Sequence, residues 1–192
     1  MEGAAYWLHK GVPEAPQAIV RLDFMRVAVG SDHAGFDLKE ILKAELAALG
    51  HDVTDLGTHD AVTSVDYPDY GAAVGRNVAS HEADLGLCVC GSGNGIAMAA
   101  NKVPGVRAAV VHDVTTAALA RRHNHANVVC FGSRTTGTTV VVDALHAFLD
   151  APEEPGRHVG RIEKLAALDG AAADTAGPER ELVHHTAPEG TT

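Results

Sequence analysis

The chain has 192 residues, of which 46% are hydrophobic and 21% charged, so it is long enough for one domain with its own core. Its formal net charge of −10 argues against nucleic acid as a partner, because phosphate-backbone contacts need basic residues. A small anionic substrate needs only a local cluster of donors and stays possible. No apolar run approaches the roughly 20 residues of a membrane span.

The ends differ from the middle of the chain. Residues 1–24 contain Pro13 and Pro16 and lack a signal peptide's basic start and apolar stretch. We expect an irregular N-terminal extension with Met25 as the natural start; the alternative is a genuine N-terminal arm. Residues 171–192 have no apolar periodicity, which predicts a disordered tail. A single domain is therefore expected over residues 25–170.

Within that domain, short apolar runs alternate with helical patterns. In chain order they predict a strand at 26–30, a helix at 36–49, a strand at 51–56, a helix at 70–80, a strand at 85–90, a helix at 96–101, a strand at 107–111, a helix at 114–123, a strand at 127–131, and helices at 138–149 and 157–168. This alternation predicts a doubly wound, five-stranded parallel sheet in a three-layer αβα sandwich, a Rossmann-like α/β fold. Ligands of such folds bind in loops at the carboxyl ends of strands.

Three cysteines, Cys88, Cys90 and Cys130, form no CxxC pair, and their odd number provides no disulfide framework. This usage indicates free thiols in a reducing compartment, so we expect a cytoplasmic protein. We also expect Cys88 and Cys90 to lie on opposite faces of their strand.

The loop after the first strand contains Asp32 and His33. Both side chains would face the ligand crevice of the predicted fold. Asp32 could equally be an N-cap for the next helix, and the residues alone do not decide between these two roles.

The loop after the third strand runs from Cys90 through Gly91, Ser92, Gly93 and Asn94 to Gly95. Backbone N–H groups at a helix N-terminus favour an anion, although a tight turn would also need glycines. The loop matches a dinucleotide fingerprint only in part, because position 96 is isoleucine. A thiol beside such a helix start ionises more readily and can act as a base or nucleophile; the alternative is a buried, inert cysteine.

Two further groups of candidate binding residues follow later in the chain. His123 and Asn124 end a predicted helix, where a histidine could simply offset the helix dipole. Arg157 and Arg161 are four residues apart and would share one helix face, which suits a phosphate. The alternative is a solvated stripe that pairs with nearby glutamates. No histidines have the spacing of a known metal motif, so no metal site is expected.

Together these motifs resemble the ribose-5-phosphate isomerase B family, which includes the galactose-6-phosphate isomerase subunits. The matching stretches are residues 31–35, 66–68, 90–95, 100–102, 123–124, 131–134 and 156–158. Each is weak alone, but their order is specific over roughly residues 25–170. The resemblance implies a parallel αβα sandwich and a cofactor-free aldose–ketose isomerase that works through an enediolate. It also implies a homodimer, or a dimer of dimers, with shared active sites.

The resemblance further implies catalytic roles. Cys90 would move the proton between C1 and C2, and Ser92 would assist transfer between the two oxygens. The amides of residues 91–95 would stabilise the enediolate. His123 would open the sugar ring, with Asp32 contributing.

Binding roles follow in the same way. Tyr67 and Asn124 would line the sugar site. The phosphate would be held by His33, Arg134, Arg157 and Arg161.

The family has a cysteine version and a glutamate version of the base. Cys90 and Ile96 match the cysteine version, whereas the sequence of residues 91–94 resembles the glutamate version. The substrate could therefore be ribose 5-phosphate, or it could be a tetrose, another pentose or a hexose phosphate. Two rival functions remain at this point. One is a nucleotide-dependent oxidoreductase with Asp113 as a ribose-binding acid, and the other is a non-catalytic sugar-phosphate sensor.

Overall fold

The computed structural model describes residues 24–171. The predicted N-terminal extension and C-terminal tail therefore lie almost wholly outside the described residues. Within residues 24–171, none of the helices is both long and apolar enough to cross a bilayer.

Five parallel strands form one sheet in the order β2-β1-β3-β5-β4. The strands are β1 (Arg26–Ser31), β2 (Asp52–Asp55), β3 (Leu85–Cys90), β4 (Ala108–Val110) and β5 (Val128–Gly132). Every residue of the central strand β3 is buried, as expected for a parallel strand covered on both faces. The predicted doubly wound parallel sheet is thereby confirmed.

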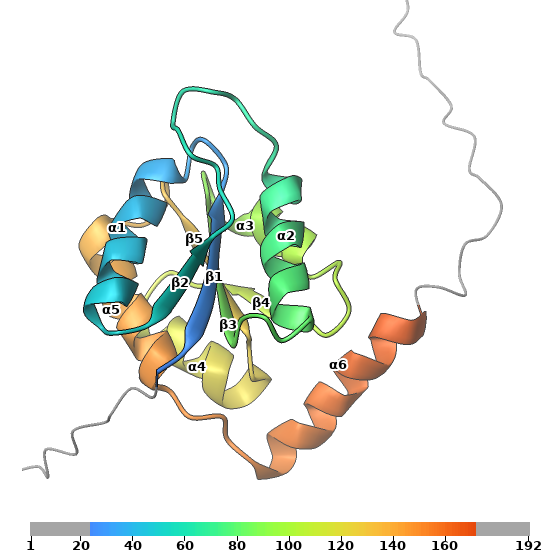
Figure 1. The fold of residues 1–192 in the computed structure, drawn as a ribbon. Helices are drawn as coiled ribbons and strands as arrows, with labels where there is room; N and C mark the ends of the chain where they lie inside the picture. Colours follow the sequence, from blue (N-terminus) through green and yellow to red (C-terminus); the bar gives the residue numbers. More distant parts are fainter. Residues whose placement is uncertain (1–23, 172–192) are drawn as a thin grey trace, which may run out of the picture.

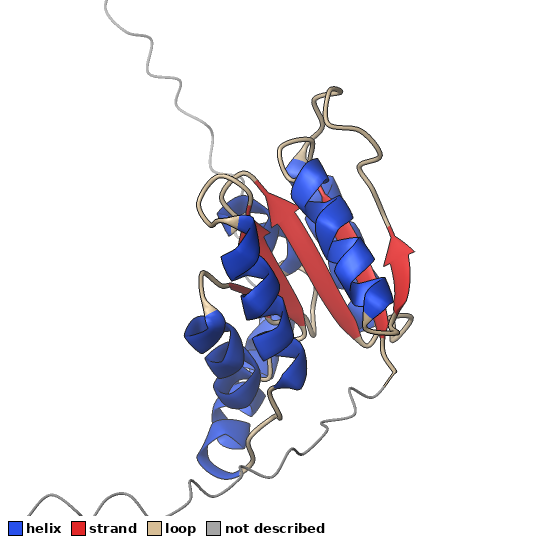
Figure 2. Cartoon of the chain, turned by 90° about the vertical axis from the view of Figure 1, so that its left-hand side faces the viewer, coloured by secondary structure: helices blue, strands red, loops and turns tan. Residues whose placement is uncertain are grey.

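Helices cover both faces of the sheet (Figures 1 and 2). One face carries α1 (Phe36–Ala48), α4 (Val114–Asn124) and α5 (Thr138–Asp150), and the other carries α2 (Tyr67–Ala79) and α3 (Asn94–Ala100). Side chains of β1 alternate between the two resulting cores, with Val27 and Val29 in the first and Ala28 in the second.

The last helix stands apart from this sandwich. After a 3₁₀ turn (η1, Gly156–His158), α6 (Val159–Ala171) extends beyond the amino ends of the strands (Figure 1). It exposes Leu165 and Leu168. The prediction of one helix over residues 157–168 was therefore wrong in part, because Arg157 lies in the 3₁₀ turn and Arg161 in α6.

Two other helices begin earlier than their apolar periodicity indicated. α2 begins at Tyr67, and Pro68 occupies its first turn, where a missing N–H costs no hydrogen bond. α3 begins at Asn94, directly after Gly93 in the left-handed conformation. Both starts are set by backbone geometry, which an apolar pattern does not reveal.

The three cysteines share one face of the sheet. Cys88, Cys90 and Cys130 belong to the core beneath α2 and α3, and all are free thiols. The expectation that Cys88 and Cys90 lie on opposite faces was wrong, because side chains two residues apart on a strand point the same way.

The strand order reverses between β1 and β3. The chain passes from β1 to β2 on one side and then crosses to β3 on the other. The loops that follow β1 and β3 therefore meet at the carboxyl edge of the sheet, where ligands of doubly wound folds bind.

Candidate active site

A pocket of about 490 Å³ opens at this carboxyl edge. Its walls come from the loops after β1, β3 and β5 and from the start of α2. It is lined by Asp32, Tyr67, Cys90, Gly91, Ser92, Gly95, Arg134 and Thr135. All except Thr135 are predicted site residues, so the structure brings together half of that predicted set.

Cys90 ends β3 and is only 4% exposed. Its Sγ accepts a hydrogen bond from the backbone N–H of Gly93, at 3.1 Å. Gly93 has a φ of 78°, a left-handed conformation that suits glycine. The glycine turn thus aims an N–H donor at the sulfur, and such donors stabilise negative charge.

Asp32 is buried and lines the pocket, and the alternative that it is the N-cap of the next helix was wrong, because Gly35 holds that position. The Asp32 Oδ1 accepts from the N–H of Gly35 at 3.0 Å, which closes the turn before α1. His33 belongs to the same loop but does not line the pocket, and its Nδ1 lies 3.2 Å from the backbone nitrogen of Val65.

The loop after β5 is hydrogen-bonded to the loop after β1 and to the loop after β3. The Ser133 hydroxyl donates to the Ala34 carbonyl at 2.7 Å, and the Ser133 N–H donates to the Cys90 carbonyl at 2.9 Å. The Arg134 N–H donates to the Gly91 carbonyl at 3.0 Å, and the Arg134 side chain lies alongside Gly91. Arg134 is the one lysine or arginine among the lining residues, so it supplies the pocket with a positive charge.

Tyr67 closes the pocket from the side of α2, with its ring packed against Gly95. Thr135 was missed by the sequence analysis. It directly follows the matched stretch 131–134, and a hydroxyl in that position was the signal that could have found it.

Gly93 and Asn94 lie in the Cys90 loop and at the start of α3, but four other predicted residues lie at the opposite edge of the sheet. α4 starts beside the carboxyl end of β4 and runs back for 11 residues, about 16 Å, so His123 and Asn124 end near the amino ends of the strands. The residue after Arg157, His158, stacks on His123 with 4.3 Å between the ring centroids. One chain therefore does not bring His123, Asn124, Arg157 or Arg161 to its own Cys90 pocket.

The His123 cluster was not foreseen. Glu154 Oε2 lies 3.6 Å from His123 Nε2 and 3.7 Å from His158 Nε2. Burial and the neighbouring charges of His123 and Arg157 lower the pKa of His158. The three potential ligand atoms lie within 4.8 Å of one another. The rings, however, are parallel to within 5°, so their nitrogen lone pairs do not converge on a tetrahedral metal position.

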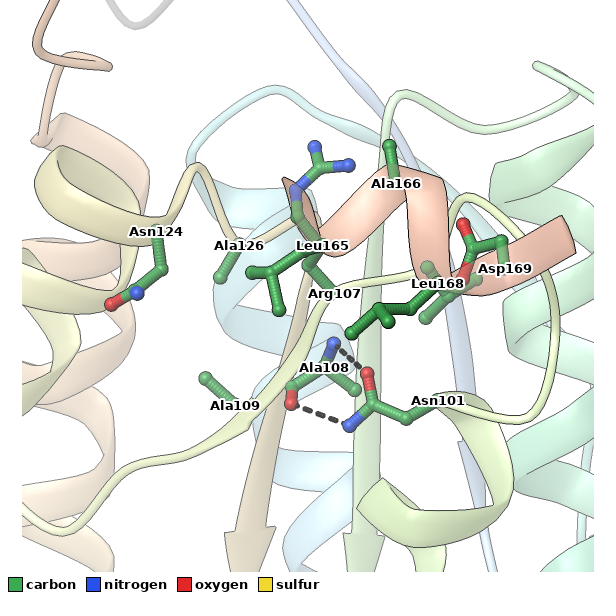
Figure 3. A pocket seen from close by; sticks show the side chains of 11 residues that line it. Asn101, Arg107, Ala108, Ala109, Asn124, Ala126, Leu165, Ala166, Leu168 and Asp169 are labelled. Carbon is green, nitrogen blue, oxygen red and sulfur yellow. Dashed lines mark hydrogen bonds between the residues drawn. The ribbon is translucent and has the colours of Figure 1, made fainter. Parts of the chain in front are cut away.

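Asn124 lines a second, mainly apolar pocket of about 380 Å³ between α6, α4 and β4 (Figure 3). Leu165 and Leu168 of α6 form part of its wall. The Asn101 side chain bridges the backbone N–H and carbonyl of Ala108, each at 2.8 Å. This pocket has no residue in common with the Cys90 pocket.

Comparison with known proteins agrees with this geometry. The family model for Ribose/Galactose Isomerase matches residues 27–165. The chain belongs to the ribose/galactose isomerase family. It is accordingly an enzyme of the aldose–ketose isomerase class.

Three relatives illustrate the similarity. Ribose-5-phosphate isomerase B of Escherichia coli is 42% identical over 144 residues, which cover 75% of this chain and 96% of that protein. Galactose-6-phosphate isomerase subunit LacB of Clostridium acetobutylicum is also 42% identical, over 73% of this chain and 80% of that protein. The solved structure of Clostridium thermocellum ribose-5-phosphate isomerase B has a TM-score of 0.76 at 41% identity, covering 77% of this chain and 99% of that one.

In this member of the ribose/galactose isomerase family, Asp113 is a helix cap. Its carboxylate accepts from the Thr116 N–H at 2.8 Å in a capping box, and this bond lowers the pKa of Asp113. A carboxylate already bonded to its own helix is poorly placed to hold a nucleotide ribose. The observation weakens the oxidoreductase alternative.

Proposed function

We propose that this chain interconverts ribose 5-phosphate and ribulose 5-phosphate through an enediolate, with Cys90 as the base. The observation that carries the proposal concerns the Cys90 thiol. Its sulfur accepts a hydrogen bond from the Gly93 N–H inside a pocket that also contains Asp32 and Arg134. This reaction needs a base, N–H donors for an oxyanion and a cation for a phosphate. Cys90, other backbone N–H groups of its glycine loop and Arg134 are the candidates for these three tasks.

In the proposed reaction, Cys90 takes the proton from C2 of the open aldose and returns it to C1. The negative charge that develops on the substrate oxygen is stabilised by backbone N–H groups of residues 91–95. Ser92 carries a proton from the C2 oxygen to the C1 oxygen. The product is the ketose, and no external oxidant or reductant is required because the exchange is internal.

We propose that His123, Asn124, Arg157 and Arg161 act in the Cys90 pocket of a second copy of the chain. His123 and Asn124 end α4 at the amino edge, about 16 Å of helix away from the carboxyl edge. A homodimer, or a dimer of dimers, lets them reach a neighbouring Cys90 pocket.

In that shared site His123 and Asp32 open the sugar ring. Tyr67 and Asn124 line the sugar. The phosphate is held by His33, Arg134, Arg157 and Arg161.

The second candidate substrate is a hexose phosphate. The similarity to a galactose-6-phosphate isomerase subunit equals that to the E. coli enzyme, at 42% identity. The Cys90 loop acts on C1 and C2, which both substrate classes share, so the two candidates differ only in the distance from these atoms to the phosphate.

The test is ketose formation from a panel of tetrose, pentose and hexose phosphates, with a chelator present and no metal added. We expect ribose 5-phosphate to have the highest kcat/KM, and no change in NAD(H) absorbance. A higher kcat/KM for a hexose phosphate would show that the hexose phosphate, and not ribose 5-phosphate, is the preferred substrate. Activity that disappears with chelator and returns with a divalent ion would overturn the metal-free mechanism.

A further inference from the structure

Lys39 is a buried cation that the proposed reaction does not use. It lies on α1, and its side chain has no exposed surface. Its Nζ donates to both carboxylate oxygens of Asp55, at 2.8 and 2.9 Å, and to the backbone carbonyl of Thr58, at 2.7 Å. Burying an ammonium group is costly unless it is fully paired, and these three bonds, with an ion pair to Glu40 Oε1 at 3.1 Å, supply the pairing.

Asp55 holds the adjoining peptide from the other end. Its Oδ1 accepts from the N–H of Gly57 at 3.0 Å. Partial burial disfavours its ionised form, but hydrogen bonds from Lys39 and Lys43 outweigh that effect and lower the pKa of Asp55 to about 2. Asp55 therefore holds the Gly57 N–H, and Lys39 holds the Thr58 carbonyl. Together they fix the segment Gly57–Thr58.

That segment in turn holds the end of β1. The Gly57 carbonyl accepts from the Ser31 N–H at 2.7 Å, and the Thr58 N–H donates to the Ser31 carbonyl at 2.8 Å. Ser31 directly precedes Asp32, which lines the Cys90 pocket. A continuous chain of hydrogen bonds thus runs from Lys39 to the residue before Asp32.

We propose that Lys39 and Asp55 are positioning residues that hold Asp32 at the pocket through Gly57–Thr58. The inference rests on the proposed function, in which Asp32 contributes to opening the sugar ring. An apolar residue in place of Lys39 would leave the Thr58 carbonyl without its donor, and the peptide beside Ser31 would be free to shift. Small displacements of this kind reduce turnover strongly.

The first experiment replaces Lys39 by the similarly shaped, uncharged methionine. Lys39→Met is expected to lower kcat for ribose 5-phosphate by about 10- to 100-fold, with little change in KM because the phosphate contacts remain. Ribulose 5-phosphate has no furanose ring, so exchange of its C1 hydrogen with heavy water needs Cys90 but no ring opening. We expect that exchange to stay near the wild-type rate.

A double variant separates positioning from stability. In Lys39→Met the Asp55 carboxylate keeps Lys43 as a partner but loses its buried one. Lys39→Met/Asp55→Asn also removes this partly buried negative charge, so part of the urea midpoint lost in Lys39→Met should return. The Thr58 carbonyl still lacks its donor, so kcat should stay low. Lys43→Met is the matched control, since Lys43 bonds Asp55 and Glu40 and no bond joins it to Thr58. Its kcat should match that of the wild type.

A folded double variant with wild-type kcat would overturn the inference, as would an equal loss of turnover and exchange in Lys39→Met. If the wild type itself does not isomerise ribose 5-phosphate, the proposed function fails instead. In that case amide hydrogen exchange decides: faster exchange at Ser31 and Thr58 in Lys39→Met, but not in Lys43→Met, supports the positioning role, and unchanged exchange refutes it.

Discussion

At the scale of single residues, the chemistry of the pocket depends on one sulfur and its donor. Cys90 and Cys88 lie on the same strand, face and core. Only Cys90 lines the pocket and receives the Gly93 N–H. The pair therefore offers a matched comparison between a proposed base and a thiol that only packs.

Cys90→Ala should lower turnover by at least ~10²-fold, the usual scale of general-base catalysis, with substrate still bound. Cys90→Ser should do little better, because a hydroxyl is a far weaker base at neutral pH. Exchange of the substrate's C2 hydrogen with heavy water, followed by NMR, should fall in step with turnover. Cys88→Ala should keep both activities in the folded enzyme. If Cys90→Ala kept them too, Asp32 or His123 would become the candidate base.

His51 is a second residue of interest, because its burial should make the stability of the fold depend on pH. It is 6% exposed, and neither ring nitrogen has a hydrogen-bond partner within the described chain. Burial lowers the pKa of His51, so the folded state requires the neutral ring. Below pH ~6.5 the unfolded chain binds a proton that the folded chain does not.

Stability should therefore fall as the pH drops below ~6.5 towards the lowered folded pKa of His51. His51→Leu should remove this part of the pH dependence and raise the free energy of unfolding by about 1 kcal/mol, because no unpaired nitrogen remains buried. Urea unfolding at pH 5 and pH 8 measures both effects. His146→Leu is the control, since His146 has Glu45 as a partner at 2.7 Å, and it should retain the His51-dependent loss.

At the scale of elements, the close approach of α2 to α3 supports the glycine loop. A Cβ on Gly71 of α2 would lie 2.5 Å from the Ile96 carbonyl oxygen of α3, closer than two such atoms can approach. Because α3 begins at the end of the Cys90 loop, this contact couples helix packing to the pocket.

Gly71→Ala should lower the free energy of unfolding by about 1–3 kcal/mol, the usual cost of overpacking. Gly160→Ala in α6 is the matched control, because a Cβ there meets no atom within 4 Å. It should be neutral or stabilise by about 0.5–1 kcal/mol through its better helix propensity. Equal urea midpoints for the two variants would show that α2 and α3 can separate at no cost.

At the scale of the whole molecule, the predicted site residues occur at two opposite edges of one sheet. Cys90 pairs with Gly132 at the carboxyl edge, whereas His123 ends α4 at the amino edge. If both groups serve one reaction, two chains must contribute to each site, and inactive variants should complement each other.

Mixing Arg157→Ala with Cys90→Ala should restore activity. Random exchange in equal amounts makes half of the dimers mixed, each with one intact site, so about a quarter of wild-type turnover is expected. Mixing Asp32→Asn with Cys90→Ala should restore none, because both residues line one pocket of the same chain. Confirmed subunit exchange without recovery in the first mixture would contradict shared sites.

Much of the fold was accessible from the sequence because its signals are local. The apolar run of residues 85–90 matches β3 from end to end, and the helical spacing after Phe36 matches α1. Strand–helix alternation then implies parallel strands, whose carboxyl ends meet at one edge. That is why the loops of Asp32 and Cys90 were predicted to lie together, and they do.

Only the tertiary structure decided which distant side chains touch. Glu154 and His158 meet His123 across some 30 residues of sequence, and Lys39 meets Asp55 and Thr58 across the gap between α1 and β2. Neither contact corresponds to a periodic pattern in the sequence. Each depends on how two elements pack and on the direction in which a single side chain then points. The same packing sends His123 away from Cys90, since a helix that crosses back over a parallel sheet must end at the opposite edge.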